Sequence, residues 1–154
     1  MATMQQILAW EDAVEAAAKS ILTAAGVTAY RQRDTDTMTS PACAVQATNF
    51  REGAMQYQVS GEAFRAPAQF ACQLTVSVIT ERTKNASSHT TNVGKCRAGI
   101  YDLDEWTSQR IPYHQIVSCR ATGSSEELDT ARNYDITTLQ FELEFLTRSS
   151  AWPT

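Results

Sequence analysis

The sequence predicts an α+β fold: a mainly antiparallel sheet with two helices packed on one face, plus a protruding hairpin arm and an extended C-terminal tail. Two observations lead to this prediction. Segments with a helical repeat of apolar residues are interspersed with segments in which apolar and polar residues alternate. The chain has 154 residues, the size of one domain, and it shows no internal repeat. We therefore expect residues 1–154 to form a single domain.

The first expected element is an amphipathic helix that ends near residue 25. Its apolar residues recur at steps of three and four, which places them on one helical face. They are Ile7, Trp10, Val14, Ala17, Ala18, Ile21 and Leu22. Gly26 supplies a stop signal just after this helix. A short strand over 27–30 and a polar loop over 31–40 are expected next.

Pro41 opens a second strand, in which alternate positions are apolar: Cys43, Val45 and Ala47. The stretch 51–68 is polar and is interrupted by turn-forming residues, namely Gly53, Gly61 and Pro67. It still contains Met55, Tyr57 and Phe64. We predict that 51–68 is a hairpin arm that protrudes from the core.

The strongest strand signal follows the arm. Apolar residues fill five successive even positions, while the odd positions between them are mostly polar: Phe70, Cys72, Leu74, Val76 and Val78. This alternation is typical of a sheet that is covered on one face. A second helix is then expected, capped by Ser88 or Thr90. Its apolar stripe consists of Val93, Cys96, Ile100 and Leu103.

The last third of the chain predicts two strands separated by a loop. The first strand covers about 113–121, and a polar acidic loop is expected over 122–132. The second covers 134–146. Its apolar residues change parity at Thr137-Thr138, which predicts a β-bulge there. Residues 148–154 form the expected tail.

Composition and charge exclude several classes of protein. Thirteen Lys and Arg against seventeen Asp and Glu give a net charge of −4, which argues against a general nucleic-acid coat. No apolar run approaches the length of a membrane span. The first residues lack the basic region of a signal peptide, so we expect synthesis and retention in a cytosol.

No residue pattern for catalysis, metal binding or cofactor binding stands out. The four cysteines are widely spaced, so we expect reduced, mostly buried thiols. His89 and His114 lack neighbours typical of catalytic histidines. The acidic group Asp102, Asp104 and Glu105 is expected to be a solvated turn at a helix end. No glycine-rich phosphate loop is present. We therefore predict a protein that is not an enzyme and needs no cofactor or metal.

Several large apolar residues have no evident place in the predicted core. They are the interface candidates Met55, Tyr57, Phe64, Trp106, Leu146 and Trp152. Exposed aromatic side chains often anchor protein interfaces. The alternative is that these residues cover the edges of their own core.

The order of the elements resembles a known family. A helix ending near residue 25 is followed by a Pro41-led strand, an arm, a central strand ending in Glu81-Arg82, a Ser/Thr-capped helix and a final strand from Thr138 to Thr147. The chain then continues as Arg148-Ser149-Ser150-Ala151-Trp152-Pro153. This pattern resembles the tail terminator, or tail completion, proteins of long-tailed bacteriophages.

The resemblance implies a structural role in a virion. Proteins of this family form a six-membered ring on the head-proximal end of the tail tube. The ring ends tube polymerisation and joins the tail to the head-completion, or stopper, protein, and assembly takes place in the host bacterial cytoplasm. The implied partners are other copies of the chain, the tail-tube protein and the stopper. DNA would pass through the lumen without specific binding, and Glu126, Glu127 and Asp129 are the lumen candidates.

Three alternatives remain open from the sequence. The chain could be another head-tail connector or a tail-tube subunit. It could be a small-ligand-binding α+β module, although the residues facing its pocket would be apolar core: Leu74, Val76, Val78 and Phe141. It could also be a small hydrolase that uses Asp102, Asp104 or His89.

Overall fold

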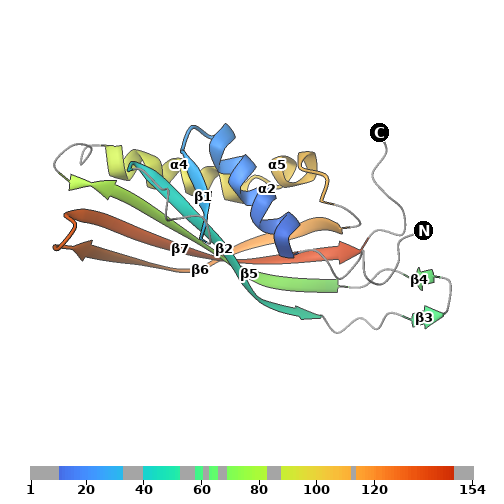
Figure 1. The fold of residues 1–154 in the computed structure, drawn as a ribbon. Coiled ribbons are helices and arrows are strands. Elements are labelled where there is room, and N and C mark those ends of the chain that lie inside the picture. Colours follow the sequence, from blue (N-terminus) through green and yellow to red (C-terminus); the bar gives the residue numbers. More distant parts are fainter. Residues whose placement is uncertain are drawn as a thin grey trace.

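A layer of helices covers one face of a five-stranded sheet, as Figure 1 shows. The computed structural model describes residues 11–32, 40–52, 58–60, 63–65, 69–82, 88–111 and 114–147. This arrangement confirms the predicted α+β class. No described helix is long and apolar enough to span a bilayer.

The sheet has the strand order β1-β2-β5-β7-β6. The bounds are Ala29–Arg31 for β1, Ala42–Glu52 for β2, Gln69–Glu81 for β5, Tyr134–Thr147 for β7 and His114–Asp129 for β6. Strand β1 runs parallel to β2, and the three other neighbouring pairs are antiparallel. The mainly antiparallel sheet is therefore confirmed, and β1 overlaps the short strand predicted over 27–30.

Helix α2 (Glu11–Ala24) packs its predicted apolar face against the sheet and the other helices. Val14, Ala18, Ile21 and Leu22 are at most 1% exposed. Gly26 ends the helix with a φ of 96°, a conformation that costs glycine little because it has no Cβ. Ile7 and Trp10 lie outside the described residues.

The centre of the core is the strand with the clearest alternation. The even residues of β5 from Phe70 to Thr80 are all buried, whereas its odd residues are half-buried except for Ala71. On the neighbouring strand β7 the matching core residues are odd-numbered: Leu139, Phe141, Leu143 and Phe145. The predicted one-sided sheet is thus confirmed.

Three helices, rather than the two expected, lie in the described part of the chain. Helix α4 (His89–Tyr101) buries Val93, Cys96 and Ile100 as predicted. Ser88 occupies its N-cap position, but its side chain makes no capping hydrogen bond. Leu103 does not continue this stripe, because the chain leaves the helix at Asp102 and begins α5 (Leu103–Ser108). Leu103 is therefore 39% exposed.

The acidic loop predicted over 122–132 is wrong in its first part. Residues 122–129 instead continue β6, which pairs with β7 up to Asp129↔Tyr134. Most side chains of this extension are exposed, from Arg120 to Leu128. Because neither face of the strand is buried there, the sequence carries no apolar alternation to mark it.

The β-bulge predicted at Thr137-Thr138 is also wrong. Both ladders of β7 run regularly through these residues, with Ser77↔Thr138 on one side and Ser125↔Thr138 on the other. Thr137 faces the core and is 4% exposed. Because the inward position is filled by a polar residue, Thr137, the change of parity among the apolar residues of the strand was only apparent. The register shifts of the sheet lie between Thr48 and Arg51, between Ile116 and Ser118 and between Ala121 and Gly123.

The arm contains a hairpin, as predicted. Strands β3 (Gln58–Ser60) and β4 (Ala63–Arg65) form a separate two-stranded antiparallel sheet. Figure 1 shows this hairpin beyond the ends of β2 and β5, away from the five-stranded sheet. Phe64 lies in β4 opposite Val59. Met55, Tyr57, Trp152 and the tail over 148–154 lie outside the described residues.

Candidate assembly surface

Trp106 is not an interface residue, so this part of the sequence prediction is wrong. Its side chain is 2% exposed and belongs to the hydrophobic core. The indole Nε1–H donates a 2.8 Å hydrogen bond to the carbonyl of Ile100, which lies in the last turn of α4. Trp106 therefore holds α5 against the end of α4. Leu146 is half-buried on the face opposite the helices, and its interface role stays a prediction.

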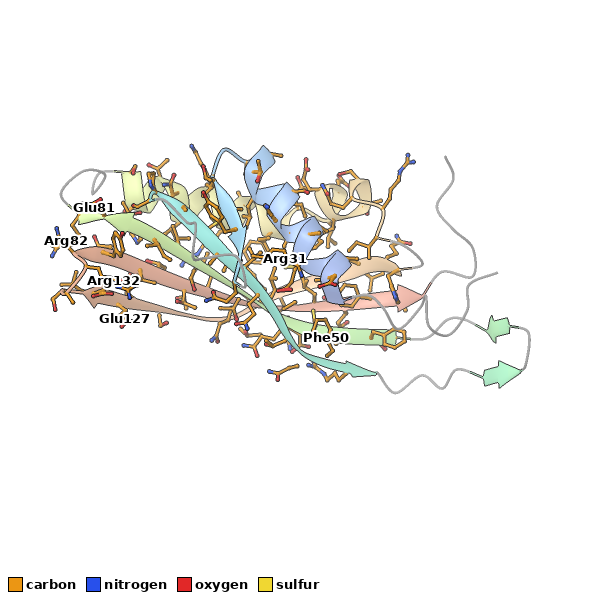
Figure 2. The ribbon with its side chains drawn as sticks, viewed as in Figure 1. Arg31, Phe50, Glu81, Arg82, Glu127 and Arg132 are labelled. Atoms are coloured by element: carbon orange, nitrogen blue, oxygen red, sulfur yellow. The ribbon has the colours of Figure 1, made fainter. Side chains whose placement is uncertain are left out.

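The lumen candidates lie together at one end of the sheet. Glu126 and Glu127 are exposed near the end of β6, and Figure 2 shows Glu127 and Arg132 close to the β6–β7 turn. Asp129 is half-buried and accepts a 3.1 Å hydrogen bond from the backbone N–H of Arg132. This bond stabilises the turn. The placement is compatible with a lumen role, which stays a prediction.

Strand β6 is an edge of the sheet. Its inner side pairs with β7, and no described strand pairs with its outer side. From Arg120 to Leu128 the side chains are exposed as well. An edge of this kind presents unpaired N–H and C=O groups that readily pair with another strand.

The exposed large hydrophobic residues are spread along this edge and the helices next to it. Within the described ranges they are Tyr101, Leu103, Val117 and Leu128. Val117 and Leu128 belong to β6 itself. Tyr101 packs edge-on against Phe141, whose strand neighbour is Ala121 of β6, and Leu103 begins α5, which packs on β6. We call β6 together with these residues the β6 edge surface.

On the opposite side of the sheet, the chain itself covers part of the outer edge of β2. Strand β1 covers β2 at Cys43 to Val45. Just beyond Val45, the buried Glu15 accepts a 3.4 Å hydrogen bond from the N–H of Ala47. Glu15 also forms a 2.9 Å ion pair with Arg31. Arg31 also contacts Asp12 at 2.6 Å, and Figure 2 places Arg31 close to α2. These anions raise the pKa of Arg31 above its ordinary value, with the bond to Glu15 as the largest cause.

The residues considered for catalysis make contacts that stabilise the fold. The two ring nitrogens of His89 each lie 2.8 Å from a threonine hydroxyl, Thr80 on β5 and Thr137 on β7. Asp102 caps α5 by accepting from the N–H groups of Asp104 and Glu105. His114 is buried against the rings of Phe70 and Phe145. The described residues contain no group of His, Cys, Asp and Glu suited to hold a metal ion.

The proposed ligand pocket between helices and sheet is filled by core. Leu74, Val76, Val78 and Phe141 are at most 1% exposed. A hollow of about 300 Å³ does exist among the helices, bordered by Ala24, Ala98, Gly99 and charged side chains such as Lys95 and Glu105. Its lining also includes Ile21 of the core.

The cysteines are free thiols, as expected from their spacing. Cys43, Cys72 and Cys96 are buried, and Cys119 is half-buried. Burial raises the pKa of Cys72 to about 12 and that of Cys119 to about 11. A hydrogen bond with Cys96, followed by burial, raises the pKa of Cys43.

Thiol modification of Cys119 should be slow near neutral pH. Its pKa of about 11 replaces an ordinary value of 9.0, so the reactive thiolate is about 100-fold rarer than in the unfolded chain. The stabilising effect of the protonated thiol is fully present below pH 9 and is lost as the pH rises toward 11. A thiol-reactive disulfide reagent at about pH 8 measures the rate, and Cys119→Ser identifies the phase that belongs to this residue. A native rate equal to the rate in urea would contradict the prediction.

Comparison with known proteins defines the fold class. No family model matches the chain, and no curated protein matches it. Among solved structures, the chain is similar to one in the virion of a native gene transfer agent (GTA) particle. The TM-score is 0.58 at 12% sequence identity, and the match covers 90% of this chain and 98% of the other. The likeness therefore shows a shared fold along almost the whole of both chains.

Proposed function

We propose that this chain is a structural protein of a phage-like virion. In this role it forms a ring at the head-proximal end of the tail tube, ends tube polymerisation and joins the tail to the head-completion protein. The observation that carries the proposal is the shared fold with a chain of the GTA virion over nearly the full length of both. The element order of the tail terminator proteins leads to the same conclusion.

The surface of the protein supports a ring. A closed ring needs a heterologous contact, in which one patch meets a different patch on the next subunit. The two sides of this sheet differ: the short β1 and Glu15 cover β2 from Cys43 to Ala47, whereas the outer side of the long β6 meets no described strand. The separate β3–β4 hairpin adds a second, unlike element.

The ring would also have to pass DNA without binding it. Glu126, Glu127 and Asp129 give one end of the sheet three acidic side chains close together. If this end lines the lumen, like charge keeps the DNA phosphates from adhering. Such a role needs no cofactor or metal, and it places the mature protein in the tail or neck of the virion.

Mass measurement of the purified chain across a wide concentration range, with negative-stain images of the same samples, tests the proposal. We expect closed rings that never lengthen. Open-ended tubes would instead indicate a tail-tube subunit. A compact dimer that does not change with concentration would favour the ligand-binding or hydrolase alternatives.

Alanine at the former catalytic candidates should leave assembly intact. Asp102→Ala removes the α5 cap and should lower stability by about 1 kcal/mol. His89→Ala removes the bridge between Thr80 and Thr137 and should cost about 1–2 kcal/mol. Thermal unfolding measures both costs, and Asp102→Asn, which keeps a capping oxygen, is the control. Full loss of biological function with folding and assembly preserved would favour the hydrolase.

A further inference from the structure

The hydrogen-bonding pattern of the sheet fixes which groups of β6 point outward. In an antiparallel pair, residues alternate between those bonded to the partner strand and those facing away. The N–H groups of Cys43 and Ala47 point away from β5, since they bond to Thr28 and Glu15. At the far end of β5, the N–H of Arg82 bonds to Asn133 on the β7 side.

The observed registers carry this alternation from β5 to β7 and from β7 to β6. Even residues of β5 bond to odd residues of β7, so the even residues of β7 bond to β6. In the regular ladder over 123–129, the N–H groups of Gly123, Ser125 and Glu127 therefore face β7. Those of Ser124, Glu126 and Leu128 face outward. Glu126 and Leu128 belong to the exposed part of the strand.

This outward row lacks most of the devices that protect strand edges. Proline, charged side chains, β-bulges and a covering helix or loop are the usual means. Residues 123–129 contain no proline and lie exposed from Gly123 to Leu128, so the acidic Glu126, Glu127 and Asp129 supply their charge. The two register shifts of β6 lie before this segment. The β2 edge, by contrast, has its Ala47 N–H bonded to Glu15.

The β3–β4 hairpin supplies a strand that fits such an edge. Each of its strands has three residues, and the hairpin pairs with no strand of the five-stranded sheet. A two-stranded hairpin is marginally stable in water unless further strands or packing support it. Its position beyond the ends of β2 and β5 leaves it directed away from its own sheet (Figure 1).

We propose that the β6 edge surface binds the β3–β4 hairpin of a second copy of this chain, which adds to the sheet next to Ser124, Glu126 and Leu128. The hairpin and the β6 edge are different patches. Each copy can therefore place its hairpin on one neighbour and bind the hairpin of another neighbour, as a closed ring requires. Of the exposed hydrophobic residues, Leu128 lies in this contact. As an account of the ring contact, the inference rests on the proposed function.

Two variants test the two sides of the contact, the β6 edge and the hairpin, one at a time. The edge variant, Ser124→Pro with Glu126→Pro, removes two outward N–H groups and leaves the ladder to β7 intact, since proline is tolerated at outward edge positions. Its matched control, Ser124→Ala with Glu126→Ala, keeps both N–H groups. The arm variant replaces residues 53–69 by Asn-Gly, so that the paired residues Arg51 and Ala71 are joined by a four-residue loop.

Sedimentation velocity and circular dichroism test the proposal on the full chain. We expect the wild type and the alanine control to assemble, and the edge variant and the arm variant to be folded monomers. Association of the edge variant should be about tenfold or more weaker. A mixture of the two variants should form a one-to-one heterodimer, because the edge variant still has an arm and the arm variant still has an edge.

Three results would overturn the proposal. One is a mixture that forms no heterodimer, and another is an edge variant that assembles like the wild type. The third is an arm variant that dimerises alone, which would indicate β6 pairing with β6. If closed rings persist in the edge variant, this contact is wrong while the proposed ring function stands. If the wild type forms no ring, the function fails, and heterodimer formation still tests the contact.

Discussion

Trp106→Ala should destabilise the protein by about 3–5 kcal/mol, the usual cost of removing a large aromatic side chain from a core. Trp106 is 2% exposed, and its indole donates to the carbonyl of Ile100 at 2.8 Å. The substitution leaves a cavity where α4, α5 and β6 meet. Urea denaturation monitored by far-UV circular dichroism measures the change in free energy of unfolding.

Trp106→Phe is the matched control, because it keeps an aromatic ring and removes the N–H donor. It should cost less than alanine, and the difference reports on volume rather than on the hydrogen bond. If Trp106→Ala left stability unchanged while assembly was lost, Trp106 would be an interface residue after all.

Glu15→Ala should destabilise the protein by about 2–4 kcal/mol, because it leaves the Ala47 N–H without this acceptor and Arg31 without its buried anionic partner. The Glu15 side chain is 7% exposed and the Arg31 side chain 19% exposed, and they form a 2.9 Å ion pair. The same carboxylate accepts the N–H of Ala47 at the β2 edge. Thermal and urea unfolding measure the loss.

Asp12→Ala provides a control on the same arginine. Asp12 contacts Arg31 at 2.6 Å, but its side chain is 74% exposed, so its loss should cost less than about 1 kcal/mol. Equal effects of the two substitutions would mean that burial of Glu15 does not matter. Aggregation of Glu15→Ala would further indicate that the carboxylate protects the β2 edge.

The parts of the fold that could be predicted are those with one buried and one exposed face. Strand β5 and helix α2 show their periods clearly because each buries one side only. Two predictions failed for residues in the interior of the protein. Trp106 has no helical stripe around it because α5 is only six residues long. Thr137 is polar yet inward, because its hydroxyl lies 2.8 Å from His89 on α4.

The second half of β6 could not be predicted for the opposite reason. Its residues are exposed on both faces, so composition there resembles a loop. The candidate surface was missed with it, since the strand pairing of Glu126 and Leu128 depends on β7. The segment Thr122-Gly123-Ser124-Ser125 has the composition of a loop and carries no strand signal.

The point at which the arm is inserted into the sheet makes sequence changes in the arm different from sequence changes in the core. Glu52 and Phe70 are paired across β2 and β5, so the segment between them, of which Gln69 still belongs to β5, begins and ends at neighbouring positions of the sheet. Lengthening such an insertion costs little, because loop-closure entropy grows only with the logarithm of length. Changes in the length of this segment are therefore expected to alter the stability of the core little. The position between Glu52 and Phe70 is accordingly a permissive site for grafting foreign sequences.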